Sequence, residues 1–344
     1  MTINKQTHIA YKKIGSFKDV IKNITYKARF IGYDNKKQPI LDNTIKLPTI
    51  VFTGTVKIHG TNASVCWQST TNKIWYQSRK QIKRQGHYNF VKHMSNVDFG
   101  EIYKKVYDQL SSKHRRCIVT IFGEWGGKNI HNCNVGIEKL PRKFYIFGIK
   151  ITASEGPYFN SFYMHDDFVK SIQHKDDRVD NIFNYKNFKH AIDFNNSDTF
   201  FKIKELTEEV EKECPVAGGI GEGIVWKGKY KGDEFMFKEK GDLHSQRNPK
   251  VIKPFDHIEH KCCKDFALTY VNKNRIYQAL FENDLTINSA SKKHTGIIIK
   301  WVYEDIISEE GTEILISKLN EKMLKVELGK LTRELFFDML DSYD

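Results

Sequence analysis

Cysteine, proline and long apolar runs are all scarce in this sequence of 344 residues. Its 6 cysteines include no CxxC pair, which excludes a disulfide framework and is typical of the reduced cysteines of an intracellular protein. No stretch approaches the roughly 18 apolar residues of a membrane-spanning helix, and residues 1–6 lack the apolar core of a secretory signal. We therefore expect a cytoplasmic protein without a membrane segment.

Acidic residues are also in short supply relative to basic ones. The chain has 55 Lys and Arg against 42 Asp and Glu, a formal net charge of +13. A surplus of this size favours a polyanionic partner, whether nucleic acid, nucleotide or anionic membrane. The hydrophobic fraction of 40% is sufficient for a sizeable core, and the length is that of about two domains of roughly 150 residues each.

Most of the chain before residue 254 is predicted to form strands, interrupted by an amphipathic helix near 99–110 and a charged helix near 203–213. The predicted strands cover residues 50–56, 63–68, 73–78, 117–122, 144–151, 223–229 and 234–240. Beyond residue 254, apolar residues three and four apart predict helices at 272–281, 296–307, 313–323 and 331–340. We therefore expect an α+β fold, with a β-rich domain over residues 1–254 and a small helical domain over residues 255–344.

Lys57 ends one of these strands just before a glycine turn, in the segment Lys-Ile-His-Gly-Thr-Asn of residues 57–62. A lysine there is presented rigidly, and Gly60 would let the backbone approach a bound phosphate. Lysine is a nucleophile only when deprotonated, a state that burial or nearby cations favour. The pattern Lys-x-x-Gly is weak evidence by itself, because it recurs in the chain. The other lysines in this pattern are Lys12, Lys83, Lys229, Lys238 and Lys293.

Charged residues lie at the ends of other predicted strands. Glu124 follows a strand that runs into a glycine turn, and Glu222 opens the strand after the second predicted helix. In the last predicted strand, alternation places two phenylalanines on one face and Lys238 and Lys240 on the other. Two ammonium groups on one face repel each other unless an anion or water screens them. A bound phosphate and a solvated strand face both explain the pair.

The order of these residues resembles that of the covalent nucleotidyltransferase superfamily of RNA ligases, DNA ligases and mRNA capping enzymes. Residues 57–62 are most similar to the nucleotide-binding motif of the RNA ligase 2 branch, which includes phage T4 RNA ligase 2 and the RNA-editing ligases. The resemblance covers about residues 53–240. It implies an antiparallel-sheet-rich, ATP-grasp-like adenylyltransferase domain that carries an N-terminal extension, and an ATP-dependent RNA ligase that seals 3′-OH and 5′-phosphate ends.

The resemblance also implies residue roles. Lys57 would attack the α-phosphorus of ATP and become a lysyl-AMP, and pyrophosphate would leave. Lys238 and Lys240 would grip the α-phosphate, because this chemistry needs alignment and positive charge beside the developing negative oxygens. Arg79, in Gln-Ser-Arg, would contact the nucleotide and the RNA end. The implied nucleotide-binding residues are Val56, Ile58, His59, Gly60, Asn62, Arg79, Glu124, Phe147 and Glu222.

Within this set, the resemblance assigns Glu124 to the ribose hydroxyls and Phe147 to stacking on the adenine. Glu222 would help to hold Mg²⁺ (or Mn²⁺), a metal that needs only one or two carboxylates because phosphates and water complete its shell. His59 and Asn62 match residues of the branch that act in the later, RNA-dependent steps.

The chain departs from the family at Gly148, where Asp or Asn often follows the stacking aromatic residue. Its helical C-terminus favours the RNA ligase 2 branch, since capping enzymes and DNA ligases continue into an OB domain. A capping guanylyltransferase, a DNA ligase and a non-catalytic RNA-binding protein remain alternatives. The expected partners are RNA ends, as a nicked duplex or broken RNA, bound by a monomer without any membrane.

Two features near the C-terminus have more than one reading. By resemblance, the tail would help to engage RNA ends, whereas a packing domain with a solvated basic face explains its cations equally well. These cations include Lys292, Lys293 and Lys300. Zinc-ligand types also cluster nearby, but no second ligand pair follows at the usual spacing, so no zinc site is predicted. The clustered residues are Asp256, His257, His260, Cys262 and Cys263.

Overall fold

The computed structural model describes residues 6–130, 135–154, 160–196, 198–241, 243, 259–316 and 319–342. The chain divides into two compact units. The first contains Met1–Ile14 and Thr49–Glu239, and the second contains Gly15–Pro48 and Lys240–Asp344. Residues 15–48 thus group with the second unit, whereas the domain predicted from the sequence over residues 1–254 includes them. The predicted boundary at residues 254 and 255 lies outside the described residues and stays a prediction.

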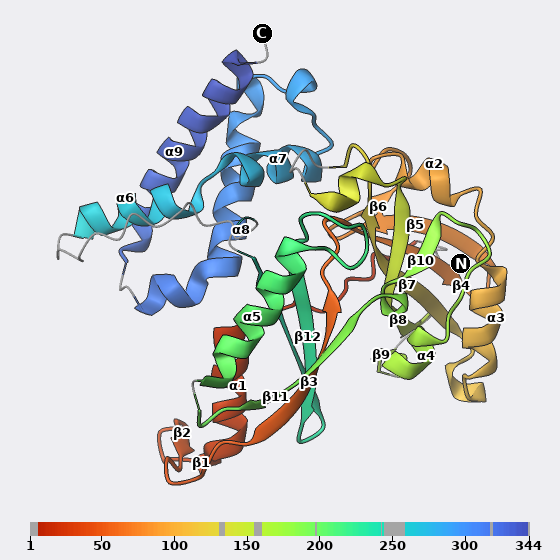
Figure 1. The fold of residues 1–344 in the computed structure, drawn as a ribbon, viewed down its shortest axis with the longest axis horizontal. Helices are drawn as coiled ribbons and strands as arrows, with labels where there is room; N and C mark the ends of the chain where they lie inside the picture. Colours follow the sequence, from red (N-terminus) through yellow and green to blue (C-terminus); the bar gives the residue numbers. More distant parts are fainter. Residues whose placement is uncertain are drawn as a thin grey trace. The chain divides into compact units, whose positions relative to one another are not determined.

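The larger sheet of the first unit has seven strands, six of which are ordered β10-β8-β7-β4-β5-β6, with β9 paired to β8. These strands are β4 (Gly60–Gln68), β5 (Lys73–Ser78), β6 (Ile82–Lys83), β7 (Cys117–Gly126), β8 (Lys143–Ala153), β9 (Phe162–Tyr163) and β10 (Val179–Asn181). In this sheet β10 pairs with β8 in parallel, and the neighbours β4–β5, β4–β7, β5–β6, β7–β8 and β8–β9 pair antiparallel. One face carries the main core, which is covered by α2 (Phe90–Met94), α3 (Gly100–Asp108) and α4 (Asp166–Lys170) (Figure 1).

The smaller sheet has four strands, in the order β11 (Asn187–Asp193), β3 (Thr49–Val56), β12 (Gly223–Tyr230) and β13 (Asp233–Lys240). Helix α5 (Asp198–Lys212) packs on β11 and β12. Phe52, Trp226 and Phe237 are fully buried on one face, where the last two rings stack. Because side chains alternate along a strand, Lys227 and Lys238 point to the opposite face.

The second unit contains α1 (Phe17–Arg29) with the short hairpin β1 (Phe30–Tyr33) and β2 (Pro39–Leu41), and a helical C-terminal region. The long C-terminal helices are α6 (Glu259–Tyr270), α7 (Lys273–Glu282), α8 (Thr295–Ile316) and α9 (Glu321–Asp341). They enclose one apolar cluster, beside which the buried Arg275 of α7 forms ion pairs with Asp305, Glu309 and Glu310 of α8. In the parts of the chain that the structure describes, short 3-10 helices lie at Ser112–His114, Gly136–Lys139, Ile182–Asn184, Ile287–Ser289 and Lys292–His294.

These elements confirm the predicted α+β fold, with antiparallel sheets followed by a helical C-terminal region. Each predicted strand corresponds to an observed strand within a few residues. The predicted helix at 313–323 is wrong, because α8 ends at Ile316 and α9 begins at Glu321. The Asn320 side chain caps α9 by accepting hydrogen bonds from the backbone N–H groups of Lys322 and Met323 at 3.1 and 3.2 Å. No helix in the described ranges is long and apolar enough to cross a bilayer.

Candidate active site

Lys57 follows directly after β3 and is fixed through both its backbone and its side chain. Its N–H donates to the Gly223 carbonyl at 2.8 Å, where β3 pairs with β12. Its Nζ donates to Oε2 of Glu222 at 2.7 Å. The Glu222 side chain is only 5% exposed, while that of Lys57 is 19% exposed. Adjacent strands of the smaller sheet thus hold an amine and a buried carboxylate in direct contact, with the amine reachable from solvent.

The chain passes from the smaller sheet to the larger one at residues 57–59, because β3 and β4 belong to different sheets. His59 lies in this crossing, with its Nδ1 3.5 Å from Oε2 of Glu222. Gly60 begins β4, and a Cβ atom there would lie 2.4 Å from the Trp125 carbonyl oxygen. A glycine is therefore required here because the backbone of β7 approaches closely. This role of Gly60 is separate from the phosphate contact that the sequence suggests.

Glu124 lies on β7, and its pairing partners are Asn62 on β4 and Tyr145 on β8. Glu124 is half-buried, so its carboxyl group is partly removed from water. This desolvation is the main reason that the pKa of Glu124 is raised to about 7. The ammonium group of Lys57 opposes the shift, the carboxylate of Glu222 adds to it, and His59 and Arg79 lower it. These five predicted site residues therefore lie within electrostatic range of one another.

Phe147 lies on the same face of the larger sheet, where β8 contains a bulge. The register changes between Phe122, which pairs with Gly148, and Gly123, which pairs with Ile146, so Phe147 is the extra residue. Bulges of this kind change the direction of a side chain. The Phe147 ring is half-buried and meets the Tyr11 ring edge-on, with centroids 5.0 Å apart. Its remaining surface is available to a ligand.

The structure explains why a glycine occupies position 148, which the sequence alone does not. A Cβ atom at this position would lie 3.2 Å from a ring carbon of Tyr11. The glycine thus makes room for Tyr11 beside Phe147, at the position where the family often carries Asp or Asn. The Tyr11 ring also contacts Phe122 at 5.0 Å and Tyr163 at 5.3 Å between centroids. Burial is the main cause that raises the pKa of the Tyr11 hydroxyl far above its usual value.

Tyr11 belongs to an N-terminal segment, residues 8–12, that no sequence pattern identifies as part of the site. At one end of this segment, the Ile9 N–H donates to Oε1 of Gln77 at 3.0 Å, and the Gln77 side-chain amide donates back to the Ile9 carbonyl. Nε2 of His8 lies 3.1 Å from the carbonyl oxygen of Ser78, the residue before Arg79. This end is therefore held on β5 beside one predicted site residue.

The other end of the N-terminal segment is held on the smaller sheet. The Lys12 N–H donates to the Tyr163 hydroxyl at 2.9 Å, and Lys12 Nζ forms an ion pair with Glu234 of β13. Glu234 and Lys238 lie four residues apart on this strand and thus share a face. The segment therefore connects the two sheets that carry the predicted site residues. These contacts join residues 68 to 222 positions apart, which no local sequence pattern could indicate.

The remaining predicted residues occupy different environments. Val56 and Ile58 are buried in the core, so only their backbone atoms could face a nucleotide. Arg79 is exposed at the end of β5. Lys238 and Lys240 lie at the end of β13, which a two-residue turn joins to β12, and Lys238 therefore lies near the start of β12. Lys240 is the first residue of the second unit.

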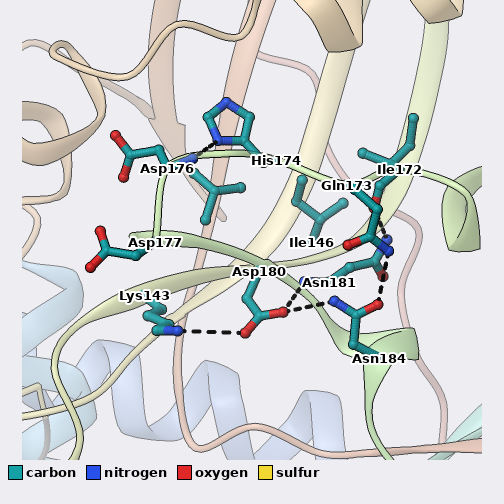
Figure 2. A pocket seen from close by; sticks show the side chains of 11 residues that line it. Lys143, Ile146, Ile172, Gln173, His174, Asp176, Asp177, Asp180, Asn181 and Asn184 are labelled. Carbon is teal, nitrogen blue, oxygen red and sulfur yellow. Dashed lines mark hydrogen bonds and ion pairs between the residues drawn. The ribbon is translucent and has the colours of Figure 1, made fainter.

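A cavity of about 200 Å³ lies elsewhere in the first unit, beside β10 (Figure 2). Asp180 accepts from Asn184 at 3.0 Å and lies 3.7 Å from Nζ of Lys143, while Gln173 donates to Asn184 at 3.1 Å. None of its lining residues belongs to the predicted site, and its polar groups largely pair with one another. We therefore locate the candidate active site at Lys57, Glu124 and Glu222 and not at this cavity.

The described residues contain no group of three His, Cys, Asp or Glu side chains arranged to hold a metal ion by themselves. Glu222 and Glu124 nevertheless supply two neighbouring carboxylates, which suits a cation that takes its other ligands from phosphate and water. Of the zinc-type cluster near residue 260, Asp256 and His257 lie outside the described residues, as do the side chains of His260 and Cys262. The remaining member, Cys263, is buried, and its thiol donates to the carbonyl oxygen of Asn320 at 3.8 Å.

The chain matches a family model described as RNA ligase over residues 50–240. No curated protein matches it. Among solved structures, it is similar to a mutant RNA ligase from Naegleria gruberi with ATP and Mn, at 15% identity and a TM-score of 0.43 over 69% of this chain. It is also similar to an archaeal ATP-dependent RNA ligase, at 11% identity and a TM-score of 0.42 over 97% of this chain and 65% of that chain.

The chain spans 56% of the length of that Naegleria ligase. The matched family region, residues 50–240, covers more than half of the chain and contains Lys57, Glu124, Glu222 and Lys238. It also contains both sheets that place these residues. The chain therefore belongs to the RNA ligase family.

Proposed function

We propose that this protein is an ATP-dependent RNA ligase that joins a 3′-OH end to a 5′-phosphate end. The observation that carries the proposal is the contact between Lys57 and the buried Glu222, with Glu124 and its raised pKa beside them. The reaction has three steps. Lys57 is adenylylated, the AMP passes to the RNA 5′-phosphate, and the 3′-OH attacks that phosphate and releases AMP.

The first step requires a lysine nucleophile that is aligned with the α-phosphorus of ATP. Nζ of Lys57 forms a bond to the α-phosphorus as the bond to pyrophosphate breaks, and the lysine proton passes to a base or to solvent. The contact of the Nζ with Glu222 and the backbone bond to Gly223 fix the direction of attack. Lys238 at the end of β13 supplies positive charge beside the α-phosphate oxygens.

The carboxylates fit a divalent cation such as Mg²⁺ or Mn²⁺, for which Glu222 is the main protein ligand and Glu124 a neighbour. When bound, this cation supplies positive charge to the phosphate oxygens. Glu124 accepts hydrogen bonds from the ribose hydroxyls, and Phe147 stacks on the adenine. An aromatic ring can stack on any purine, and such stacking stabilises binding by about 1–3 kcal/mol per base. Arg79, His59 and Asn62 are assigned to contacts with the nucleotide and the RNA end.

The experiment that tests the proposal is incubation of the purified chain with α-labelled ATP and Mg²⁺, followed by acid treatment and a denaturing gel. We expect an acid-labile label on the protein with ATP and not with GTP, which separates the ligase from a capping guanylyltransferase. A ligation panel of nicked duplex RNA, single-stranded RNA and all-DNA nicks then separates it from a DNA ligase. Tight RNA binding without covalent label would support the non-catalytic alternative.

Replacement of Tyr11 tests whether the N-terminal segment supports the nucleotide pocket. In Tyr11→Ala, the Phe147 ring loses its edge-on neighbour, a contact worth about 0.5–1.5 kcal/mol beyond area burial. We expect the KM for ATP in self-adenylylation to rise about three- to tenfold while kcat changes little. Tyr11→Phe keeps the ring and should behave as the wild type.

Tyr76→Ala is the matched control, because Tyr76 packs against the core on the opposite face of the same sheet. It should lower the melting temperature without raising the KM for ATP. If Tyr11→Ala melts at a lower temperature and its KM is unchanged, the residue serves stability alone.

A further inference from the structure

An exposed aromatic surface lies on α1 and the β1–β2 hairpin, within residues 15–48. Of the 13 large apolar residues that are exposed in the described parts of the chain, six fall between residues 26 and 45. They are Tyr26, Ile31, Tyr33, Ile40, Leu41 and Ile45. A soluble domain rarely collects apolar side chains in this way without a ligand or partner. We call these residues, together with Phe30, the hairpin surface.

The three rings of the hairpin surface are held in a fixed arrangement. Tyr26 and Phe30 stack with centroids 5.3 Å apart and an interplanar angle of 28°, and Phe30 meets Tyr33 edge-on at 5.0 Å. A hydrogen bond between the Tyr26 and Tyr33 hydroxyls is the main cause that raises the pKa of Tyr26. Tyr33 remains 64% exposed and Tyr26 39% exposed. Rings that are already fixed and exposed to solvent are suitable for stacking with a ligand, because they lose little further conformational entropy when the ligand binds.

The segment that carries these rings is rich in basic residues. Residues 15–48 contain seven Lys or Arg and three Asp. Helical spacing places Lys18, Lys22 and Tyr26 on one side of α1, since residues four apart share a face. Arg29, one turn further, donates from Nε to the Ile45 carbonyl at 3.1 Å and thereby connects the helix to the segment after the hairpin. This tenth of the chain carries nearly a third of its net positive charge.

The aspartates of this region are used in local turns. Asp19 accepts from the Ser16 N–H at 3.0 Å in a capping box at the start of α1. Asp34 accepts from the backbone of Lys36 and Gln38 in the hairpin turn, and Asp42 accepts from Thr44. These carboxylates shape the backbone, while Lys18, Lys22, Tyr26 and Tyr33 are exposed. The surface thus combines positive charge with exposed aromatic rings.

We infer that the hairpin surface binds single-stranded RNA, with bases stacked on Tyr26 and Tyr33 and phosphates beside Lys18 and Lys22. Stacking rings among cations are how proteins bind single strands without a base-edge code. The charge complementarity favours RNA over a protein partner, because an apolar protein interface is depleted of lysine at its centre. This inference rests on the proposed function for its biological meaning, and its test does not depend on covalent chemistry.

The test measures the Kd of the full chain for a fluorescent single-stranded RNA across a salt series. The double variant Tyr26→Ala/Tyr33→Ala should bind about tenfold or more weakly, because the loss of a single base stack already has about that effect and this variant removes two. Lys18→Gln/Lys22→Gln should also bind more weakly, and its slope of log K against log salt should fall by about 1.4, since each phosphate contact to a single strand contributes about 0.7. Self-adenylylation should be unchanged in both variants.

Phe201→Ala and Lys212→Gln on α5 are matched controls, being an exposed ring and an exposed lysine outside the hairpin surface. They should leave the Kd and its salt slope unchanged. If Tyr26→Ala/Tyr33→Ala binds RNA as tightly as the wild type, the inference is wrong. If the wild type forms no covalent AMP, the proposed function fails, and the RNA measurement still decides this inference.

Discussion

Lys57→Ala is expected to form no covalent adenylate with ATP and Mg²⁺, and to lose at least about a thousandfold in sealing of ordinary RNA ends. The reason is specific to this lysine, because its Nζ lies 2.7 Å from the buried Glu222 at the crossing between the two sheets. Alanine removes the nucleophile altogether, and a missing nucleophile cannot be replaced by better alignment. The measurement is acid-labile label on the protein, beside ligation of a nicked RNA.

Lys229→Ala is the matched control for this variant. Lys229 precedes a glycine in the same Lys-x-x-Gly pattern, but it is exposed near the far end of β12. It should adenylylate and seal at wild-type rates. The Lys57→Ala chain should also still seal RNA that carries a pre-formed 5′-adenylate, because the lysine acts only before the third step. Equal labelling of Lys57→Ala and the wild type would exclude Lys57 as the nucleophile.

The strands around this lysine could be predicted because their signals are local. Alternation of apolar residues in residues 50–56 and 234–240 identifies β3 and β13, and the order of the charged strand ends identifies the family. The break between α8 and α9 was also present in the sequence, since Asn320 is a good N-cap. Apolar spacing across residues 313–323 concealed it, because helical periodicity continues on both sides of the cap.

The contacts of the site could not be predicted in the same way. Tyr11 meets Phe147 across 136 positions of sequence, and Lys12 meets Glu234 across 222. Nothing near Tyr11 in the sequence indicates a partner so distant. Gly148 is a second example. The sequence shows that it departs from the family pattern, but only the structure shows the Tyr11 ring that lies beside it. A sequence pattern identifies residue types at strand ends, whereas long-range packing decides what they touch.

Glu124→Gln is expected to impair activity and to stabilise the protein at the same time. The loss of a charged acceptor for the ribose hydroxyls should lower kcat/KM for ATP about ten- to a hundredfold, the usual range for a hydrogen bond to a charged group. The gain in stability follows from the pKa of Glu124, which is raised from 4.5 to about 7 chiefly by burial. A buried carboxylate that must ionise at neutral pH opposes folding.

The raised pKa of Glu124 also determines how its contribution to stability depends on pH. The folded state binds the Glu124 proton more tightly than the unfolded chain, so this contribution to stability is full below pH 4.5 and is lost as the pH rises through 7. Glutamine carries no charge at any of these pH values. The free energy of unfolding of Glu124→Gln should therefore exceed that of the wild type by about 2–3 kcal/mol at pH 8, with little difference near pH 4.5.

Urea unfolding at both pH values measures this difference, and Glu101→Gln provides the control because Glu101 is exposed on α3. The control should show no growing difference between the two pH values. A Glu124→Gln chain that is no more stable than the wild type at pH 8 would show that the carboxyl group is better solvated than its surroundings imply. We therefore expect the Glu124 carboxylate to lower the stability of the folded protein at neutral pH. This loss of stability is explained if the charge of Glu124 is needed when the nucleotide binds.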